Sequence, residues 1–154
     1  VGDILEVGAE GTSIGTSVGI PSAETRLHLE IIAARPAAAV LHTHSIWGTL
    51  LSDRYATRAG VAIQGYEMLK GLAGVTTHEH REWIPVLEND QDIARLAERV
   101  ASTLREYPDC HAFLLRRHGL YTWGATVPEA VRHVEIVEFL LESVGRKESA
   151  SWRS

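Results

Sequence analysis

Cysteine is almost absent from this chain, whose 154 residues include a single cysteine, Cys110. One thiol excludes a disulfide within the chain, and scarce cysteine is typical of proteins that work in a reducing compartment. We therefore expect a cytoplasmic protein.

Long apolar runs and basic blocks are also missing. No apolar run approaches the length of a membrane-spanning helix, and no segment has the pattern of a secretory signal. Lys and Arg number 15 against 20 Asp and Glu, so the formal net charge is -5. This balance argues against a nucleic-acid or membrane-surface partner, but it is compatible with a local basic pocket for a phosphate.

The length suits one domain over residues 1–154, with enough chain to bury a real core. The first residue is Val1 rather than methionine, so we expect that an amino-terminal part is missing.

Histidine is abundant, and its placement is informative. The apolar run 37–41 predicts a buried strand that ends in His42-Thr43-His44. Because side chains alternate along a strand, His42 and His44 should point to the same side and form half of a divalent-metal site. The best candidate for a third ligand is His118, beside Gly119. The alternative is a pair of histidines that binds nothing, since short motifs also arise by chance.

Strands and helices alternate along the chain, but several links between strands are too short for parallel crossovers. The patterns therefore predict an α/β (α+β) fold with a mixed or mainly antiparallel sheet and helices on its faces. The predicted strands are 3–7, 37–43, 60–63, 83–87, 112–115 and 121–123. Two predicted helices start at the N-caps Ser22 and Ser45, and a short helix lies within 65–71. A fourth helix is capped by Asn89 or Asp90. The last helix starts at Pro128, and its tail is expected to fray from Lys147.

Two carboxylates are candidates for chemistry. Glu24 should lie in the first turn of a helix, where the helix dipole favours its ionised form. Glu67 lies in a segment bounded by glycines and rich in apolar residues, where partial desolvation would raise its pKa and suit acid/base catalysis. The alternative for both is an exposed helix carboxylate. Arg116 and Arg117 could meet a phosphate or could cap a strand end.

The other histidines have simpler interpretations. His28, His111 and His133 lie in or beside regular elements and should be structural or surface residues. His78 and His80 form a second His-x-His in a polar stretch, where a solvated loop is the main interpretation and a contact with the site is the alternative.

Four blocks occur in a distinctive order, and together they resemble the class II aldolase/adducin family, most closely its dehydratases of 5-methylthioribulose 1-phosphate. The resemblance extends from about Pro21 to about Val144. The blocks are His42-Thr43-His44-Ser45, GYEMLKG at 65–71, Ile84-Pro85-Val86 and RHGLYTWG at 117–124. Nothing in residues 1–20 resembles the Ser-Gly-Asn loop with which family members hold the substrate phosphate.

The resemblance implies roles for individual residues. His42, His44 and His118 match the family's three zinc ligands, with one Zn²⁺ per subunit. Glu67 matches the general acid/base of the dehydratases. Glu24 matches the catalytic glutamate of the related aldolases and is expected here to bind substrate, as is Arg117.

The resemblance also implies a fold and an activity. The fold is a three-layer sandwich with a mainly antiparallel sheet, and the assembly is a homotetramer with active sites between subunits. The activity is dehydration of 5-methylthioribulose 1-phosphate in methionine salvage. The alternatives are a class II aldolase or epimerase acting on fuculose or ribulose phosphates, and a non-catalytic adducin-like module.

Overall fold

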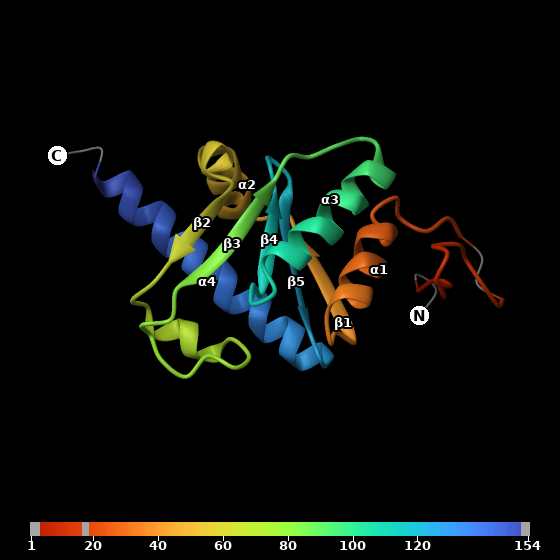
Figure 1. Cartoon of the computed structure of the whole chain (residues 1–154), viewed down its shortest axis with the longest axis horizontal. Helices are drawn as coiled ribbons and strands as arrows, with labels where there is room; N and C mark the ends of the chain where they lie inside the picture. The colour runs from red at the N-terminus through yellow and green to blue at the C-terminus, as the bar shows by residue number, and fades with distance from the viewer. Residues whose placement is uncertain (1–3, 17–18, 152–154) are drawn as a thin grey trace.

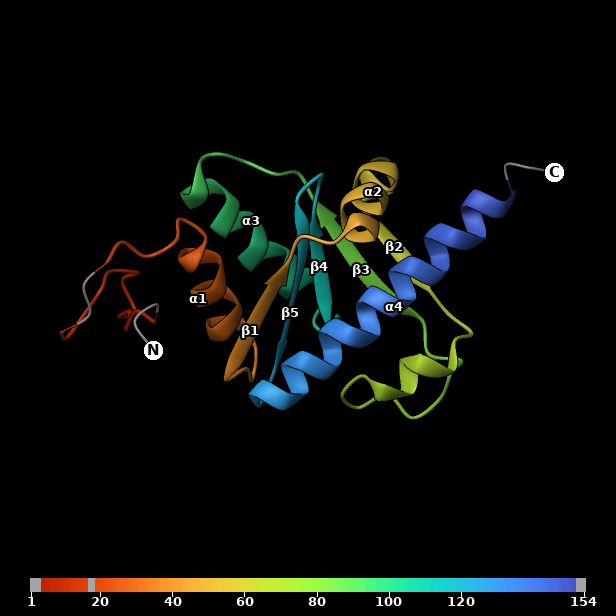
Figure 2. The same ribbon diagram turned by 180° about the vertical axis from the view of Figure 1, so that it is seen from behind.

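A computed structural model describes residues 4–16 and 19–151 and contains one five-stranded sheet between two layers of helices (Figures 1 and 2). The strands are β1 (Ala39–Thr43), β2 (Gly60–Ile63), β3 (Glu82–Leu87), β4 (Ala112–Leu115) and β5 (Gly119–Gly124). The helices are α1 (Thr25–Ala34), α2 (Ile46–Arg54), α3 (Ile93–Glu106) and α4 (Val127–Ser151), with short 3-10 helices η1 (Ala56–Arg58) and η2 (Glu67–Gly71).

The sheet has the order β1-β5-β4-β3-β2. All of its neighbouring strands are antiparallel except β3 and β4, which are parallel. Parallel neighbours need a long crossover, and α3 provides it between these two strands. The predicted mainly antiparallel sheet is confirmed.

Each face of the sheet packs on its own pair of helices. One core cluster joins α1 and α3 to the sheet, with Leu27, Val100 and Phe113 among its members. The second cluster joins α2 and α4 to the opposite face and includes Leu51 and Leu140. Figures 1 and 2 show these two layers from opposite sides. The sheet is therefore covered on both faces, and the ends of its strands remain available for a site.

Two predicted helix starts were wrong. α1 begins at Thr25, because the hydroxyl of Ser22 accepts the Glu24 N–H and closes a turn before the helix rather than capping it. α3 is capped by Asp92, whose carboxylate accepts the Arg95 N–H, whereas Asp90 forms an ion pair with the Arg95 side chain. The N-cap residue of α1, Glu24, thus makes no capping hydrogen bond with its side chain, whereas α3 is capped two residues later than the predicted Asp90.

α4 also differs from its prediction. It continues as a helix to Ser151, so the expected frayed tail from Lys147 is wrong for residues 147–151. Its sequence predicts an apolar stripe of Val131, Val134, Val137 or Glu138, and Leu141. The observed buried face includes Ala130, Val137 and Leu141, whereas Val131 is exposed. The helix is rotated by about one residue in its first turns relative to the predicted stripe.

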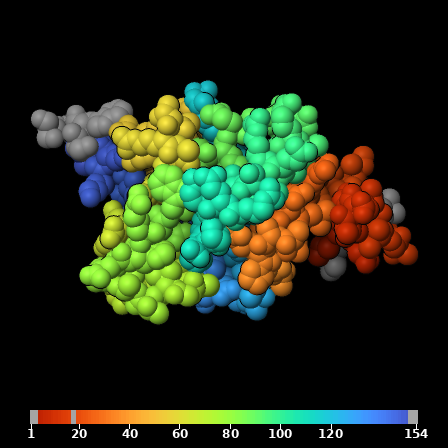
Figure 3. Space-filling model, in the orientation of Figure 1, coloured from red at the N-terminus to blue at the C-terminus, as the bar shows by residue number. Residues whose placement is uncertain are grey.

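The segment before α1 lies beside that helix, away from the sheet (Figures 1 and 3). The predicted strand over residues 3–7 is wrong for residues 4–7, where only Val7 forms an isolated bridge, with Ser13. Asp3 lies outside the described residues. No helix within residues 4–16 and 19–151 is both long and apolar enough to cross a membrane.

Candidate metal centre

The end of β1 and the β4–β5 hairpin meet at one end of the sheet. β1 pairs with β5 so that His42 lies opposite Tyr121 and Thr43 lies opposite Leu120. The turn that joins β4 to β5 contains Arg117, with φ of 56°, and His118. This turn brings His118, the predicted third ligand, beside the two histidines of β1.

Three imidazole rings and a carboxylate converge here. Nε2 of His44 lies 2.7 Å from Nε2 of His42 and 3.0 Å from Nε2 of His118. The carboxylate of Glu24 lies 3.1 Å from Nε2 of His118 and 3.5 Å from Nε2 of His42. All four ligand atoms fall within 4.8 Å of one another. His42 and His44 thus face the same side, as strand alternation predicts.

The orientation of His42 is fixed by its surroundings. Its Nδ1 donates a hydrogen bond of 2.8 Å to the carbonyl of Leu120, and its ring stacks on Tyr121 with centroids 4.0 Å apart. Burial lowers the pKa of His42 below its ordinary value. The ring is therefore held in the neutral tautomer that presents the Nε2 lone pair to the cluster.

This set of donors fits a divalent cation. Imidazole nitrogens with a carboxylate oxygen are ligands of zinc and of other first-row metals. Since the proton of His42 is on Nδ1, its Nε2 brings a lone pair toward His44 rather than a donor. The backbone carbonyl behind His42 is the kind of outer partner that orients metal-binding histidines. His42, His44, His118 and Glu24 could thus hold one metal ion.

Glu24, which the sequence predicts to bind substrate, also lies among the candidate metal ligands. It is the N-cap residue of α1 and faces His42 and His118. The sequence pattern could not reveal this contact, because it depends on how α1 lies against β1. Burial and the nearby Glu24 carboxylate also raise the pKa of Tyr121 above its ordinary value.

Glu67 lies far from this cluster. It is in η2, beyond the end of β2 that pairs with the start of β3, at the opposite end of the sheet (Figure 1). Its side chain is 70 % exposed and forms ion pairs with Lys70 and His78. The hydrogen bond from Lys70 lowers its pKa. The expected desolvation and raised pKa were wrong, because η2 directs Glu67 outward rather than toward its apolar neighbours.

The two arginines beside His118 have carboxylate partners. Arg116 forms ion pairs with Asp53 and Glu88, and Arg117 forms one with Asp53. These arginines hold the pKa of Asp53 below its usual range. The Arg117 side chain is 68 % exposed, so it can also meet an anion that approaches from solvent.

The remaining histidines fall into two groups. His28 packs edge-on against Tyr121, and His133 is buried, as expected of structural residues. His80 was predicted to lie in a solvated loop, but it forms an ion pair of 2.8 Å with the buried carboxylate of Glu82, which also contacts His111. The signal that could have found this pair is the spacing of two residues between His80 and Glu82 at the start of a strand.

The fold is a sandwich of one mixed sheet between two helix layers. A cluster of histidines and a carboxylate at one end of the sheet gives this sandwich a candidate metal site. The chain belongs to the class II aldolase and adducin N-terminal domain family, whose model matches residues 1–144. It is 50% identical over 141 residues to a methylthioribulose-1-phosphate dehydratase of Pseudomonas aeruginosa (strain LESB58), covering 91% of this chain and 68% of that protein. It is 43% identical over 143 residues to one of Sorangium cellulosum, covering 92% and 68%.

Solved structures show the same fold. An L-fuculose-1-phosphate aldolase from Thermus thermophilus has a TM-score of 0.70 at 22% identity, covering 97% of this chain and 71% of that one. Another L-fuculose 1-phosphate aldolase has a TM-score of 0.74 at 18% identity, covering 96% and 63%. The expected three-layer sandwich of class II aldolases is confirmed.

Proposed function

We propose that this chain is a metal-dependent hydro-lyase that converts 5-methylthioribulose 1-phosphate to 2,3-diketo-5-methylthiopentyl 1-phosphate and water. The convergence of the three histidine Nε2 atoms on the carboxylate of Glu24 carries this proposal. The names of relatives with up to 50% identity support the substrate. The proposed metal is one Zn²⁺ per subunit, held by His42, His44 and His118 with Glu24 beside them.

The cluster would support the first step of the proposed reaction, in which the substrate loses a proton from carbon. His42, His44 and His118 would hold the divalent cation, which would supply polarisation of a substrate carbonyl and stabilisation of negative charge beside it. β1 and the β4–β5 hairpin are rigid elements of the sheet, so the histidines would hold the cation in a fixed position. The exposed guanidinium of Arg117 lies on the same hairpin and is available for the substrate phosphate.

Glu67 is the proposed group that moves the proton. Its lowered pKa keeps it ionised at neutral pH, so it can accept the proton from C3. It then returns that proton to the departing C4 hydroxyl, which leaves as water, and the enol product tautomerises to the diketone. Acid/base catalysis of this kind contributes on the order of a hundredfold or more to the rate.

The position of Glu67 supports a site that is formed by two copies of the chain. The six residues of β3 span roughly 17 Å, and Glu67 and the histidines lie beyond opposite ends of the sheet. Within one chain, Glu67 therefore cannot reach a substrate held at the cluster. We propose a homotetramer in which Glu67 of one subunit acts on the substrate at the cluster of a neighbouring subunit. We also propose that the enzyme works in the cytoplasm, in methionine salvage.

The direct test is turnover of 5-methylthioribulose 1-phosphate by purified protein before and after metal removal. We expect formation of the diketone phosphate, loss of activity after chelation, and recovery when Zn²⁺ is restored. Full activity in the chelated protein would exclude the metal role. Absence of turnover of this substrate and of any sugar phosphate by the zinc-loaded protein would leave an adducin-like binding module as the better interpretation.

The position of Glu24 favours a second candidate function, a class II sugar-phosphate aldolase or epimerase. Its carboxylate lies directly at the cluster, where it could act as the base for cleavage of a C–C bond. Retro-aldol cleavage of L-fuculose 1-phosphate or ribulose phosphate, with no turnover of the methylthio sugar, would select this function.

A further inference from the structure

A second group of metal-binding residue types lies at the other end of the sheet. Glu82 begins β3, His80 precedes it, and His111 directly precedes β4. Nε2 of His80 lies 2.8 Å from Oε2 of Glu82, and Nδ1 of His111 lies 3.0 Å from the same oxygen. The three ligand atoms fall within 4.8 Å of one another. These spacings match those of the cluster formed by His42, His44 and His118.

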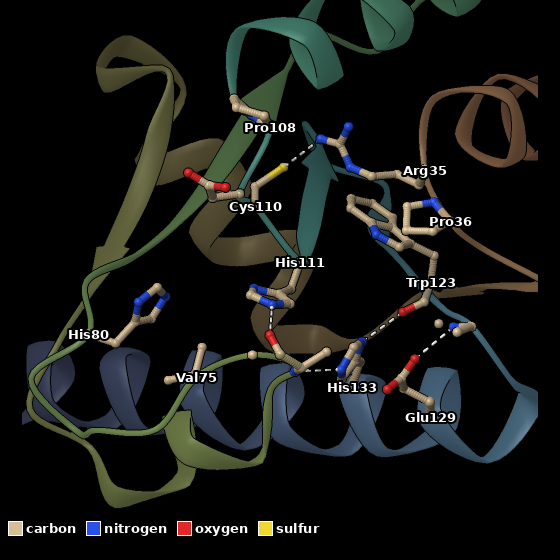
Figure 4. Close-up of a pocket in the computed structure, with 15 residues that line it drawn as sticks. Arg35, Pro36, Val75, His80, Pro108, Cys110, His111, Trp123, Glu129 and His133 are labelled. Carbon is tan, nitrogen blue, oxygen red and sulfur yellow. Dashed lines mark hydrogen bonds between the residues drawn. The ribbon is translucent and has the colours of Figure 1, made fainter.

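The two imidazole rings are already oriented toward a shared point. Nε2 of His111 donates a hydrogen bond of 2.8 Å to the carbonyl of Ala73 (Figure 4). This bond directs Nδ1 of the same ring to Glu82. A metal-ligating histidine is commonly held by a hydrogen bond from its other ring nitrogen to a backbone carbonyl. His111 therefore has the outer partner that a ligand needs.

The carboxylate of Glu82 has an unusual environment, because only 1 % of this side chain is exposed. Its Oε1 accepts the backbone N–H of His111, and its Oε2 contacts Nδ1 of His111 and Nε2 of His80. A buried carboxylate needs a nearby positive charge, which is supplied here either by a proton on an imidazole or by a cation. Divalent metal would replace that proton and bring a larger compensating charge.

Space is present beside the cluster for further ligands. A cavity of about 590 Å³ is lined by His80 and His111, and one of about 260 Å³ by His80 and Glu82. Figure 4 shows His80 and His111 on the wall of the larger cavity, with Cys110 above them. Water from these cavities can fill the coordination positions that the three side chains leave open.

We propose that His80 Nε2, Glu82 Oε2 and His111 Nδ1 form a second binding site for a transition-metal ion of the zinc class. Ligands of tetrahedral zinc lie about 3.3 Å apart at ordinary Zn–N and Zn–O bond lengths, so the observed spacings need to open by only a few tenths of an ångström. Binding releases the proton on Nδ1 of His111 to solvent and keeps the hydrogen bond to Ala73. The bound ion would fasten the segment between η2 and β3 to the sheet.

The test is titration of the metal-free protein with Co²⁺, with bound metal per chain measured after gel filtration. We expect two equivalents for the wild type and one for His80→Gln. His44→Gln should also bind one equivalent, at the site of His80. His78→Gln, which removes an exposed histidine two residues away, is the matched control and should bind two.

A wild-type value of one equivalent, lost in His44→Gln and kept in His80→Gln, would overturn the proposal. One equivalent lost in His80→Gln and kept in His44→Gln would support this site and remove the metal from the proposed active site. A second measurement avoids variants altogether. Co²⁺ should slow modification of His80 and His111 by diethyl pyrocarbonate in wild-type protein, and an unchanged rate at both residues in metal-saturated protein would contradict the site.

Discussion

Nδ1 of His42 donates its proton to the carbonyl oxygen of Leu120 at 2.8 Å, across the pairing of β1 with β5. The acceptor is a backbone atom, so the tautomer of His42 is set by strand register rather than by a neighbouring side chain. Nε2 consequently presents a lone pair to His44. The pairing of β1 with β5 thus orients the His42 ring so that Nε2 can act as a ligand.

Removal of one ligand should abolish metal binding at this cluster. We expect His44→Gln to hold one equivalent of metal fewer than the wild type and to lose dehydratase activity by at least on the order of a hundredfold, since even outer-shell changes cost that much. Metal content per chain and initial rates check this prediction. Wild-type metal content in the folded variant would contradict the assignment.

Mixing two inactive variants should restore activity. In His44→Gln subunits Glu67 is intact, and in Glu67→Gln subunits the histidines are intact. If each site takes its histidines and its glutamate from neighbouring subunits, random cyclic assembly of equal amounts gives about a quarter of the wild-type activity. The assay follows activity after the two proteins are unfolded together and refolded.

Continued inactivity of the refolded mixture would show that both residues act within one chain, whereas full activity of Glu67→Gln alone would show that Glu67 has no role. Glu79→Gln is the matched control, because it neutralises an exposed glutamate of the same segment. That variant should retain wild-type turnover alone.

Gly119→Ala should disturb the metal centre without touching a ligand. A Cβ at this position would lie 2.1 Å from the carbonyl oxygen of Thr43 and 2.9 Å from Cε1 of His42, so β1 must move away from the hairpin. We expect a loss of about 1–3 kcal/mol in the free energy of unfolding, together with weaker metal binding. Denaturant unfolding and metal titration check both effects, and an unchanged midpoint would refute the close packing.

Stability should depend on pH through His133. Nδ1 of this buried ring donates to the Trp123 carbonyl, and Nε2 accepts the Ala73 N–H, so both nitrogens are satisfied only in the neutral form. Burial, opposed in part by the hydrogen bond to Trp123, lowers its pKa, and nearby His111 lowers it further. The unfolded state therefore binds the proton more readily, and this contribution to stability is complete above about pH 6.5 and is lost as the pH falls.

The matching measurement compares wild type with His133→Gln by denaturant unfolding in chelator at pH 7.5 and pH 5. The wild type should be the more stable protein at pH 7.5, and the difference between the two should narrow at pH 5. A difference that widens on acidification would show that the folded state favours the charged ring.

Local patterns predicted the parts of the fold that local physics decides. The bounds of β2 and β4 were predicted as observed, because short apolar runs between turn residues define them. Ser45 caps α2 as predicted, with its hydroxyl accepting the Gly48 N–H. The alternation of side chains in β1 likewise placed His42 and His44 on one side.

The parts that could not be predicted depend on contacts between distant segments. Glu67 has apolar neighbours in sequence, but the turn of η2 exposes its carboxylate to Lys70 and solvent. Glu24 joins the cluster only because α1 lies beside β1. Glu82 is buried where it pairs with Ile63 of β2 and contacts His80 and His111, and no local pattern records that burial.

The strand order also determines when in its lifetime the protein can hold metal at the cluster of β1. A nascent chain that has exposed His42 and His44 carries only part of the ligand set, and the carbonyl of Leu120 that orients His42 is synthesised much later. The site comes into existence when β5 docks between β1 and β4. The full set of candidate ligands is therefore brought together only in a chain whose synthesis has passed β5.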